Sequence, residues 1–222
     1  MYVAEVKLKE IHLVEILSDN EFVVDMMYAR KENMLRTPVY QMVGLGNRCF
    51  VHHDLADCLG RLKPLLRQRK LKLKICDAYR PVEAFYLMKK IIPVDGFFAL
   101  SPERSQHCHA SAIDAILLDE NGIELEFPCH VDAYEERFAL QVAKKQWNDF
   151  FQHLEKAKYD WNESGFDEQI ANRKLLRCLM ETVGLRALEH EWWHFNLPDK
   201  DKYPLIWGHF EKNGETRFFI HD

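Results

Sequence analysis

The sequence predicts an α+β fold in a single domain that covers residues 1–222, with a central, mostly antiparallel sheet flanked by helices. Helical patterns are interleaved with strands that turn back on themselves, which is unlike the regular alternation of a doubly wound sheet. The 222 residues are enough to bury one large core. No repeat, low-complexity tract or linker marks a domain boundary.

The first helical pattern follows Asp54, which can cap a helix. Its apolar residues recur with the 3.6-residue period of an amphipathic helix, and basic residues suit its end near position 70. We expect Pro64 to kink this helix or split it in two, because proline lacks the backbone donor and clashes with the preceding turn. The apolar positions are Leu55, Leu59, Leu62 and Leu66.

Alternating apolar residues over 71–75 predict a strand that ends at the segment 77–81, Asp-Ala-Tyr-Arg-Pro. Pro81 suits the first position of a helix that continues to about Ile92.

Residues 93–110 have the composition of a loop, and residues 112–118 predict a second strand. The turn over 119–122 ends in Asn-Gly, which favours a hairpin. A third strand is therefore expected over 123–127.

The C-terminal part of the chain predicts two helices and an extended segment. A helix is expected within 134–158, although its apolar period is poor. A clearer helix covers Asp167 to Val183, with the aspartate as N-cap and Gly184 at its C-terminal end. Residues 185–196 are aromatic and predict extended chain.

Composition excludes several classes of protein. The 30 basic and 35 acidic residues give a net charge of −5 without any charged tail, so we do not expect nucleic-acid binding. No segment approaches the roughly 18 apolar residues of a membrane helix, and no signal peptide is recognised. The six cysteines are scattered and form no CxxC pair. We expect reduced thiols in a cytoplasmic protein. The oligomeric state is left open.

Three segments combine ionisable side chains with the end of a predicted strand, namely 77–81, 105–114 and 190–195. We therefore expect a site at the edge of the sheet. Zn²⁺ prefers imidazole nitrogen together with carboxylate oxygen, and a catalytic zinc site has three protein ligands and one open position. His107, Asp114 and one later histidine would complete that set. A nearby glutamate could deprotonate the metal's water, and a fixed guanidinium could stabilise the oxyanion.

The last of these segments, 190–195, can be interpreted in two ways. His190, Glu191 and His194 match the spacing of HExxH zinc proteases, in which both histidines project from one face of a helix. The context opposes a helix, since a glycine ends the preceding one, a proline follows and the aromatic residues favour extended chain. The other interpretation joins residues 191–195 to the two earlier ligand candidates.

The motifs support the second interpretation. Ser-x-His-x4-Ala-x-Asp over 105–114 is followed about eighty residues later by Glu-x-Trp-His at 191–194. Together with the segment 77–81, these motifs resemble the zinc D,D-peptidase family, which includes the D-alanyl-D-alanine dipeptidases of vancomycin resistance and zinc D,D-carboxypeptidases. The likeness covers most of the chain, because Tyr28-Ala29 and Val39-Tyr40 also stand in family order.

The resemblance implies roles for particular residues. It implies one Zn²⁺ per chain, with the ligands His107, Asp114 and His194. It makes Glu191 the base and Arg80 the group that stabilises the tetrahedral intermediate, although Arg80 could also pair with Asp77.

The resemblance also implies a substrate. A small closed pocket would hold the free amino group of a dipeptide, and the residues that match its lining are Tyr28, Ser105 and Asp132. We therefore predict hydrolysis of D-Ala-D-Ala, a cell wall precursor, to free D-alanine. Resistance, D-alanine recycling and wall turnover all fit such an activity.

The sequence departs from the family at two positions. Ala110 replaces the usual glycine, and alanine costs about 1 kcal/mol there if the backbone needs a positive φ. His109 replaces an arginine, and could compete for the metal or weakly replace the positive charge. Cys108, beside the metal loop, is interpreted as a spectator and not as a nucleophile.

Three alternatives remain open at this stage. A D,D- or L,D-carboxypeptidase acting on muropeptides would use the same metal in a more open cleft. A non-catalytic zinc-binding module is possible because the metal scaffold resembles the hedgehog signalling domain, although Glu191 and Arg80 are intact. An HExxH zincin would use His190 in place of His107.

Overall fold

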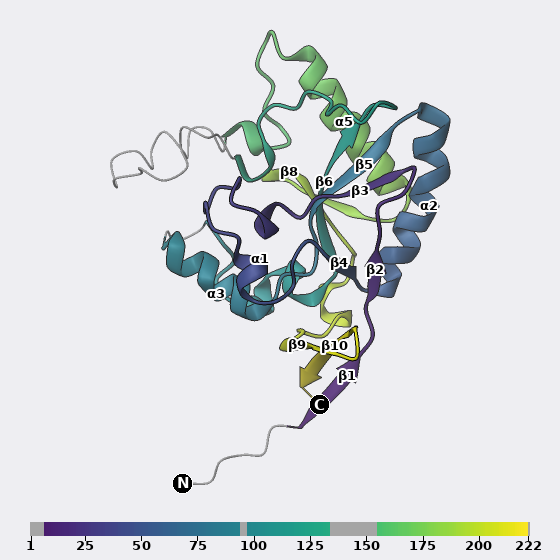
Figure 1. Ribbon diagram of the computed structural model, residues 1–222. Coiled ribbons are helices and arrows are strands. Elements are labelled where there is room, and N and C mark those ends of the chain that lie inside the picture. The colour runs from purple at the N-terminus through teal and green to yellow at the C-terminus, as the bar shows by residue number, and fades with distance from the viewer. Residues whose placement is uncertain (1–6, 94–96, 134–154, 222) are drawn as a thin grey trace.

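The computed structural model describes residues 7–93, 97–133 and 155–221, and its main sheet has five strands in the order β3-β5-β6-β8-β7 (Figure 1). Only the β3–β5 pair is parallel, and the other pairs are antiparallel. The prediction of a mostly antiparallel sheet in an α+β fold is confirmed. The strands are β3 (Phe22–Val24), β5 (Lys72–Asp77), β6 (Ala112–Leu118), β7 (Arg186–Leu188) and β8 (Glu191–Asn196).

Two smaller sheets contain the other strands of the described residues. One joins the two ends of the chain in the order β1-β10-β9, and the other pairs β2 with β4. All their pairs are antiparallel. Their bounds are β1 (Leu8–Ile11), β2 (Val14–Ile16), β4 (Cys49–Val51), β9 (Gly208–Lys212) and β10 (Glu215–His221).

Helices cover both faces of the main sheet. Figure 1 shows α2 and α5 on one side of it and α1 and α3 on the other. The α-helices are α1 (Val39–Met42), α2 (His53–Arg69), α3 (Val82–Ile91) and α5 (Asp167–Thr182). The short 3-10 helices are η1 (Met27–Ala29), η2 (Pro102–Arg104), η3 (Gln106–His109), η4 (Val131–Ala133), η6 (Glu155–Ala157) and η7 (Lys200–Lys202).

The predicted apolar face of helix α2 is confirmed, but its N-cap and the effect of Pro64 differ from the prediction. Pro64 does not split the helix, because it lies on the solvent side and the Gly60 carbonyl that it leaves unbonded is also at an exposed residue. The N-cap is His52, whose Nδ1 accepts the Asp54 N–H at 3.2 Å. The four leucines of the apolar face, Leu55, Leu59, Leu62 and Leu66, are fully buried.

The strand predicted over 112–118 is β6, but the expected third strand is absent. Residues 123–127 lie in the described part of the chain and form a single bridge, between Leu118 and Glu124. The chain then leaves the sheet so that Phe127 stacks on Trp192, with ring centroids 4.2 Å apart. Stacking of Phe127 on the buried Trp192 takes precedence over extension of the hairpin.

The C-terminal predictions have mixed outcomes. Asp167 is the first residue of α5 and not its cap, which is Phe166 without a side-chain hydrogen bond. Gly184 follows the helix with a φ of 98°, as expected for a helix C-terminus. The helix expected within 134–158 falls outside the described residues, apart from η6. Strands β7 and β8 confirm the extended chain over 185–196.

Most of the buried apolar side chains among the described residues form one cluster, to which the main sheet, the helices and the small sheets all contribute, including Phe22, Leu59, Leu117, Trp193 and Phe218. All six cysteines belong to the described residues and none forms a disulfide. Among the described helices, none has the length and apolar character needed to cross a membrane.

Candidate active site

A row of polar side chains crosses three neighbouring strands of the main sheet. In the antiparallel register, Asp77 of β5 lies opposite Asp114 of β6, which lies opposite His194 of β8. Directly opposed residues project from the same face of a sheet. Because β6 and β8 both have neighbours on each side, this row lies over the middle of the sheet. The prediction of a site at the sheet edge is therefore wrong.

His107 reaches this row from η3, in the loop before β6. Its Nδ1 lies 2.8 Å from the Ala78 carbonyl oxygen, and its own carbonyl accepts the Arg80 N–H at 3.1 Å. A carbonyl can only accept, so Nδ1 carries the proton and Nε2 is left free for a metal. The backbone thus fixes both the orientation and the tautomer of this imidazole.

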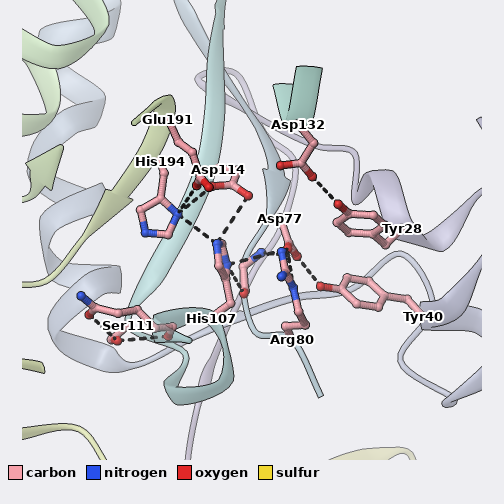
Figure 2. A network of polar contacts seen from close by, with 12 residues as sticks. Tyr28, Tyr40, Asp77, Arg80, His107, Ser111, Asp114, Asp132, Glu191 and His194 are labelled. Carbon is pink, nitrogen blue, oxygen red and sulfur yellow. Dashed lines mark hydrogen bonds and ion pairs between the residues drawn. The ribbon is translucent and has the colours of Figure 1, made fainter. Parts of the chain in front are cut away.

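His107, Asp114 and His194 bring three metal-binding atoms together (Figure 2). His107 Nε2 lies 3.1 Å from His194 Nδ1 and 3.4 Å from an Asp114 oxygen, and the other Asp114 oxygen lies 3.0 Å from His194 Nδ1. All three side chains are buried. It is the one such group within the described residues, and its two nitrogens and one oxygen suit a borderline cation such as Zn²⁺ better than Mg²⁺ or Ca²⁺.

The electrostatics of this group favour a bound cation. Burial by itself would raise the pKa of Asp114, but the charges and hydrogen bonds of His107 and His194 hold that pKa well below its usual value. Burial by itself would lower the pKa of His107, but the charges of Asp114 and Asp77 outweigh it and raise the pKa to about 9. A divalent cation can take the place of the proton that this pair of residues holds.

Glu191 opens β8 at the rim of the metal group. One of its carboxylate oxygens lies 3.7 Å from His194 Nδ1, and its side chain is 38 % exposed. Loss of solvent raises the pKa of Glu191 to about 7, although the charge of His194 opposes this rise. A carboxyl with a pKa near neutrality can both take up and release a proton.

Arg80 is held by a buried carboxylate. Its Nη2 and Nε lie 2.5 Å and 3.1 Å from one oxygen of Asp77. The other oxygen accepts hydrogen bonds from the Tyr40 hydroxyl and from the Ala78 N–H. Burial would lower the pKa of Arg80, but the charge of Asp77 outweighs it and raises the pKa well above its usual value. The pairing with Asp77 that the sequence analysis considered is present, and Arg80 also lines the cavity beside the metal group.

A cavity of about 590 Å³ opens beside the metal group. Tyr28, Ser105 and Asp132 all line it, and the Tyr28 hydroxyl donates to the Asp132 carboxylate. Burial and the nearby charge of Asp114 raise the pKa of Asp132 to about 7, against the opposing charge of Arg80. The lining residues that the sequence analysis did not single out include Phe97, Phe98, Arg104, Lys158, Leu188 and Asn196.

Comparison with known proteins agrees with this geometry. The family model described as D-Ala-D-Ala dipeptidase matches residues 7–213, nearly the whole chain. The chain belongs to this family. It is accordingly a metallopeptidase, and the buried His-Asp-His group is the set of residues that fits the metal.

Two curated relatives show how far the similarity extends. The D-alanyl-D-alanine dipeptidase of Escherichia coli is 28% identical over 196 residues, which covers 88% of this chain and 88% of the relative. The D-alanyl-D-alanine dipeptidase of Synechocystis sp. is 23% identical over 158 residues, which covers 58% of this chain and 60% of the relative.

The two departures from the family pattern have structural explanations. Ala110 ends η3 in the left-handed conformation with a φ of 52°, the conformation that glycine would adopt without strain. His109 lies with Nδ1 2.8 Å from the Tyr203 carbonyl oxygen and Nε2 3.1 Å from that of Glu103. Both its nitrogens thus face backbone oxygens, and it does not compete for the metal.

The same geometry argues against the competing assignments. His190 lines the cavity but precedes a strand, so HExxH geometry on one helix face is absent here, within the described chain. Burial raises the pKa of Cys108 to about 12, against the opposing charge of Arg80. A thiol with that pKa is not the thiolate that a nucleophile requires.

Proposed function

We propose that this protein is a zinc-dependent dipeptidase that hydrolyses D-Ala-D-Ala to two molecules of D-alanine. The observation that carries the proposal is the convergence of His107, Asp114 and His194 in one cavity with Glu191 and Arg80, in a chain of the D-Ala-D-Ala dipeptidase family.

The metal would be held by the two imidazoles and the carboxylate of the buried group. When bound, Zn²⁺ polarises the scissile carbonyl and lowers the pKa of water to about 7. His107 and Asp114 are desolvated and preoriented for this task, because the Ala78 carbonyl holds the ring of His107 and the sheet register holds Asp114.

Glu191 would act as the base and then as the acid. Its carboxylate takes a proton from the attacking water, and the same proton is delivered to the nitrogen of the leaving amine. The water is thereby divided between the new carboxylate and the new amine. Desolvation raises the pKa of Glu191 above its ordinary value in the metal-free protein, which favours uptake of a proton by this carboxylate.

Arg80 would stabilise the negative charge that develops on the carbonyl oxygen. Its guanidinium stays charged in a buried site because Asp77 is its counter-ion. Fixed charge in a water-poor site stabilises a transition state without reorganisation, which is why such groups have large effects.

The cavity would select a dipeptide by its amino group. Asp132 can accept hydrogen bonds from an ammonium, and the Tyr28 hydroxyl orients its carboxylate. An ammonium beside Asp132 also favours the charged form of that carboxyl, which burial otherwise disfavours. Ser105 lines the same cavity at the start of η3 and offers a further hydrogen-bonding hydroxyl.

The test combines zinc stoichiometry with an assay for released D-alanine. One zinc per chain and release of D-alanine from the dipeptide are expected, and Glu191→Gln should reduce kcat by about 10²–10⁴-fold while zinc is retained. A zinc-loaded protein that is inert on every D,D-peptide would refute the proposal. Faster turnover of a pentapeptide than of the dipeptide would replace it with a carboxypeptidase.

A further inference from the structure

Among the described residues that line the cavity, three side chains are positively charged at neutral pH, and two of them already form ion pairs. Arg80 pairs with Asp77 at 2.5 Å, and Lys158 pairs with Glu155 at 2.7 Å. Arg104 is exposed and has no ion pair or side-chain hydrogen bond with any described residue. Its guanidinium therefore keeps all its donors for a ligand.

The backbone holds Arg104 beside the metal loop. Arg104 is the last residue of η2 and stands three residues before His107, a separation of at most about 11 Å. Its N–H donates to the Ser101 carbonyl, and the Cys108 N–H donates to the Ser105 carbonyl, each at 3.0 Å. The contact of His109 Nε2 with the Glu103 carbonyl, at 3.1 Å, ties η2 to η3.

A dipeptide brings a second charge into this cavity. Its carboxylate lies only one residue beyond the scissile bond, so it must stay near the metal group. Asp132 and Glu191 line the same cavity and repel a carboxylate unless a cation lies beside it. A guanidinium binds a carboxylate through two parallel hydrogen bonds, and an ammonium is less specific in this geometry.

We propose that Arg104 binds the C-terminal carboxylate of the substrate and so sets the preference for a single residue beyond the scissile bond. This inference rests on the proposed function and assigns it a specificity residue. Asp132 would bind the amino group of the substrate and Arg104 its carboxylate. The cavity would therefore select a dipeptide, because both charged ends of the substrate must reach these two residues.

The test measures binding without turnover. In the zinc-loaded Glu191→Gln protein, dissociation constants for D-Ala-D-Ala and for its C-terminal amide are compared by calorimetry. The free acid should bind about 10- to 100-fold more tightly than the amide, as for a charge-assisted hydrogen bond. Adding Arg104→Gln should weaken binding of the acid by that factor, leave the amide unchanged and so remove the preference, and Arg104→Lys should keep part of it.

Two matched variants serve as controls. Lys158→Gln changes a cation of the same cavity that Glu155 already neutralises, and Arg69→Gln changes an exposed arginine on α2. Both should keep the preference for the acid. If Arg104→Gln weakens both ligands equally or leaves their ratio unchanged, the inference is wrong.

The outcomes also separate this inference from the proposed function. Equal affinity of the Glu191→Gln protein for acid and amide would overturn the role of Arg104 even if the native enzyme releases D-alanine. Failure of the native enzyme to release D-alanine, together with no binding of either ligand, would overturn both.

Discussion

Replacing Asp77 by asparagine should destabilise the protein more than any other conservative change near the site. Asp77 is fully buried and is the counter-ion of Arg80, which is 7% exposed. The substitution preserves the shape of the side chain but removes its charge. Arg80 would then be left as a buried, unpaired cation.

The size of the effect can be worked out from the contacts. Breaking a buried ion pair by removing one partner costs about 3–5 kcal/mol. Tyr40→Phe is a milder change of the same network, because it removes only the hydroxyl that donates to Asp77 and keeps the ring contact with Tyr28. A hydrogen bond to a charged group contributes about 1.5–3 kcal/mol, which corresponds to a fall in Tm of about 3–12 °C in a chain of this size.

Urea unfolding of the two variants and of the double variant provides the measurement, with fluorescence as the probe and the free energy of unfolding as the result. The double variant should cost less than the sum of the two single ones, because the Tyr40 hydroxyl acts through the Asp77 charge. The reasoning is refuted if Asp77→Asn costs no more than Tyr40→Phe, since Arg80 would then not depend on this carboxylate.

Further predictions concern pH, metal and backbone. In the metal-free protein the pKa values of Glu191 (about 7) and His107 (about 9) lie above their ordinary values, so the folded state binds more protons than the unfolded state over this pH range. The free energy of unfolding should therefore fall as pH rises from about 5 to 9. A rise over that range would contradict these shifts. His107→Ala should abolish the single zinc found by atomic absorption, whereas His190→Ala should retain it; the reverse pattern would restore the HExxH assignment. At Ala110, glycine relieves left-handed strain but loses a buried methyl worth about 0.8 kcal/mol, so Ala110→Gly should change stability by less than about 1 kcal/mol in urea unfolding, with Ala110→Val as the destabilising comparison. Equal stabilities of the two variants would show that the left-handed backbone at this position imposes no constraint.

Patterns that depend on local physics were predictable from the sequence. The leucine period of α2 and the apolar run of β6 identify buried elements, because burial requires one face or one continuous strand of apolar side chains. The predictions were wrong where contacts between residues far apart in the chain determine the local structure. Phe127 leaves the hairpin to stack on Trp192, and Pro64 is tolerated because it faces solvent.

The candidate site divides in the same way. Residue type and motif order identified His107, Asp114, Glu191 and His194 as the residues to examine, and strand propensity over 185–196 opposed the HExxH assignment, in which His190 would replace His107 as a ligand. Tyr40 was noted only for its place in the family order, and no local signal pointed to its hydrogen bond with Asp77, which lies 37 residues away in the chain. Arg104 also carried no signal, because its significance comes from the absence of a counter-ion among the described residues around it.

The amino-acid sequence alone therefore determined which chemical groups are present, in what order, and which elements are buried. The register of β5, β6 and β8, which aligns Asp77, Asp114 and His194, was decided only by the tertiary structure. So was the desolvation that raises the pKa of Glu191 and of Asp132. The reason is physical: distances and desolvation between residues far apart in the chain depend on how whole elements pack, and local propensities do not encode them.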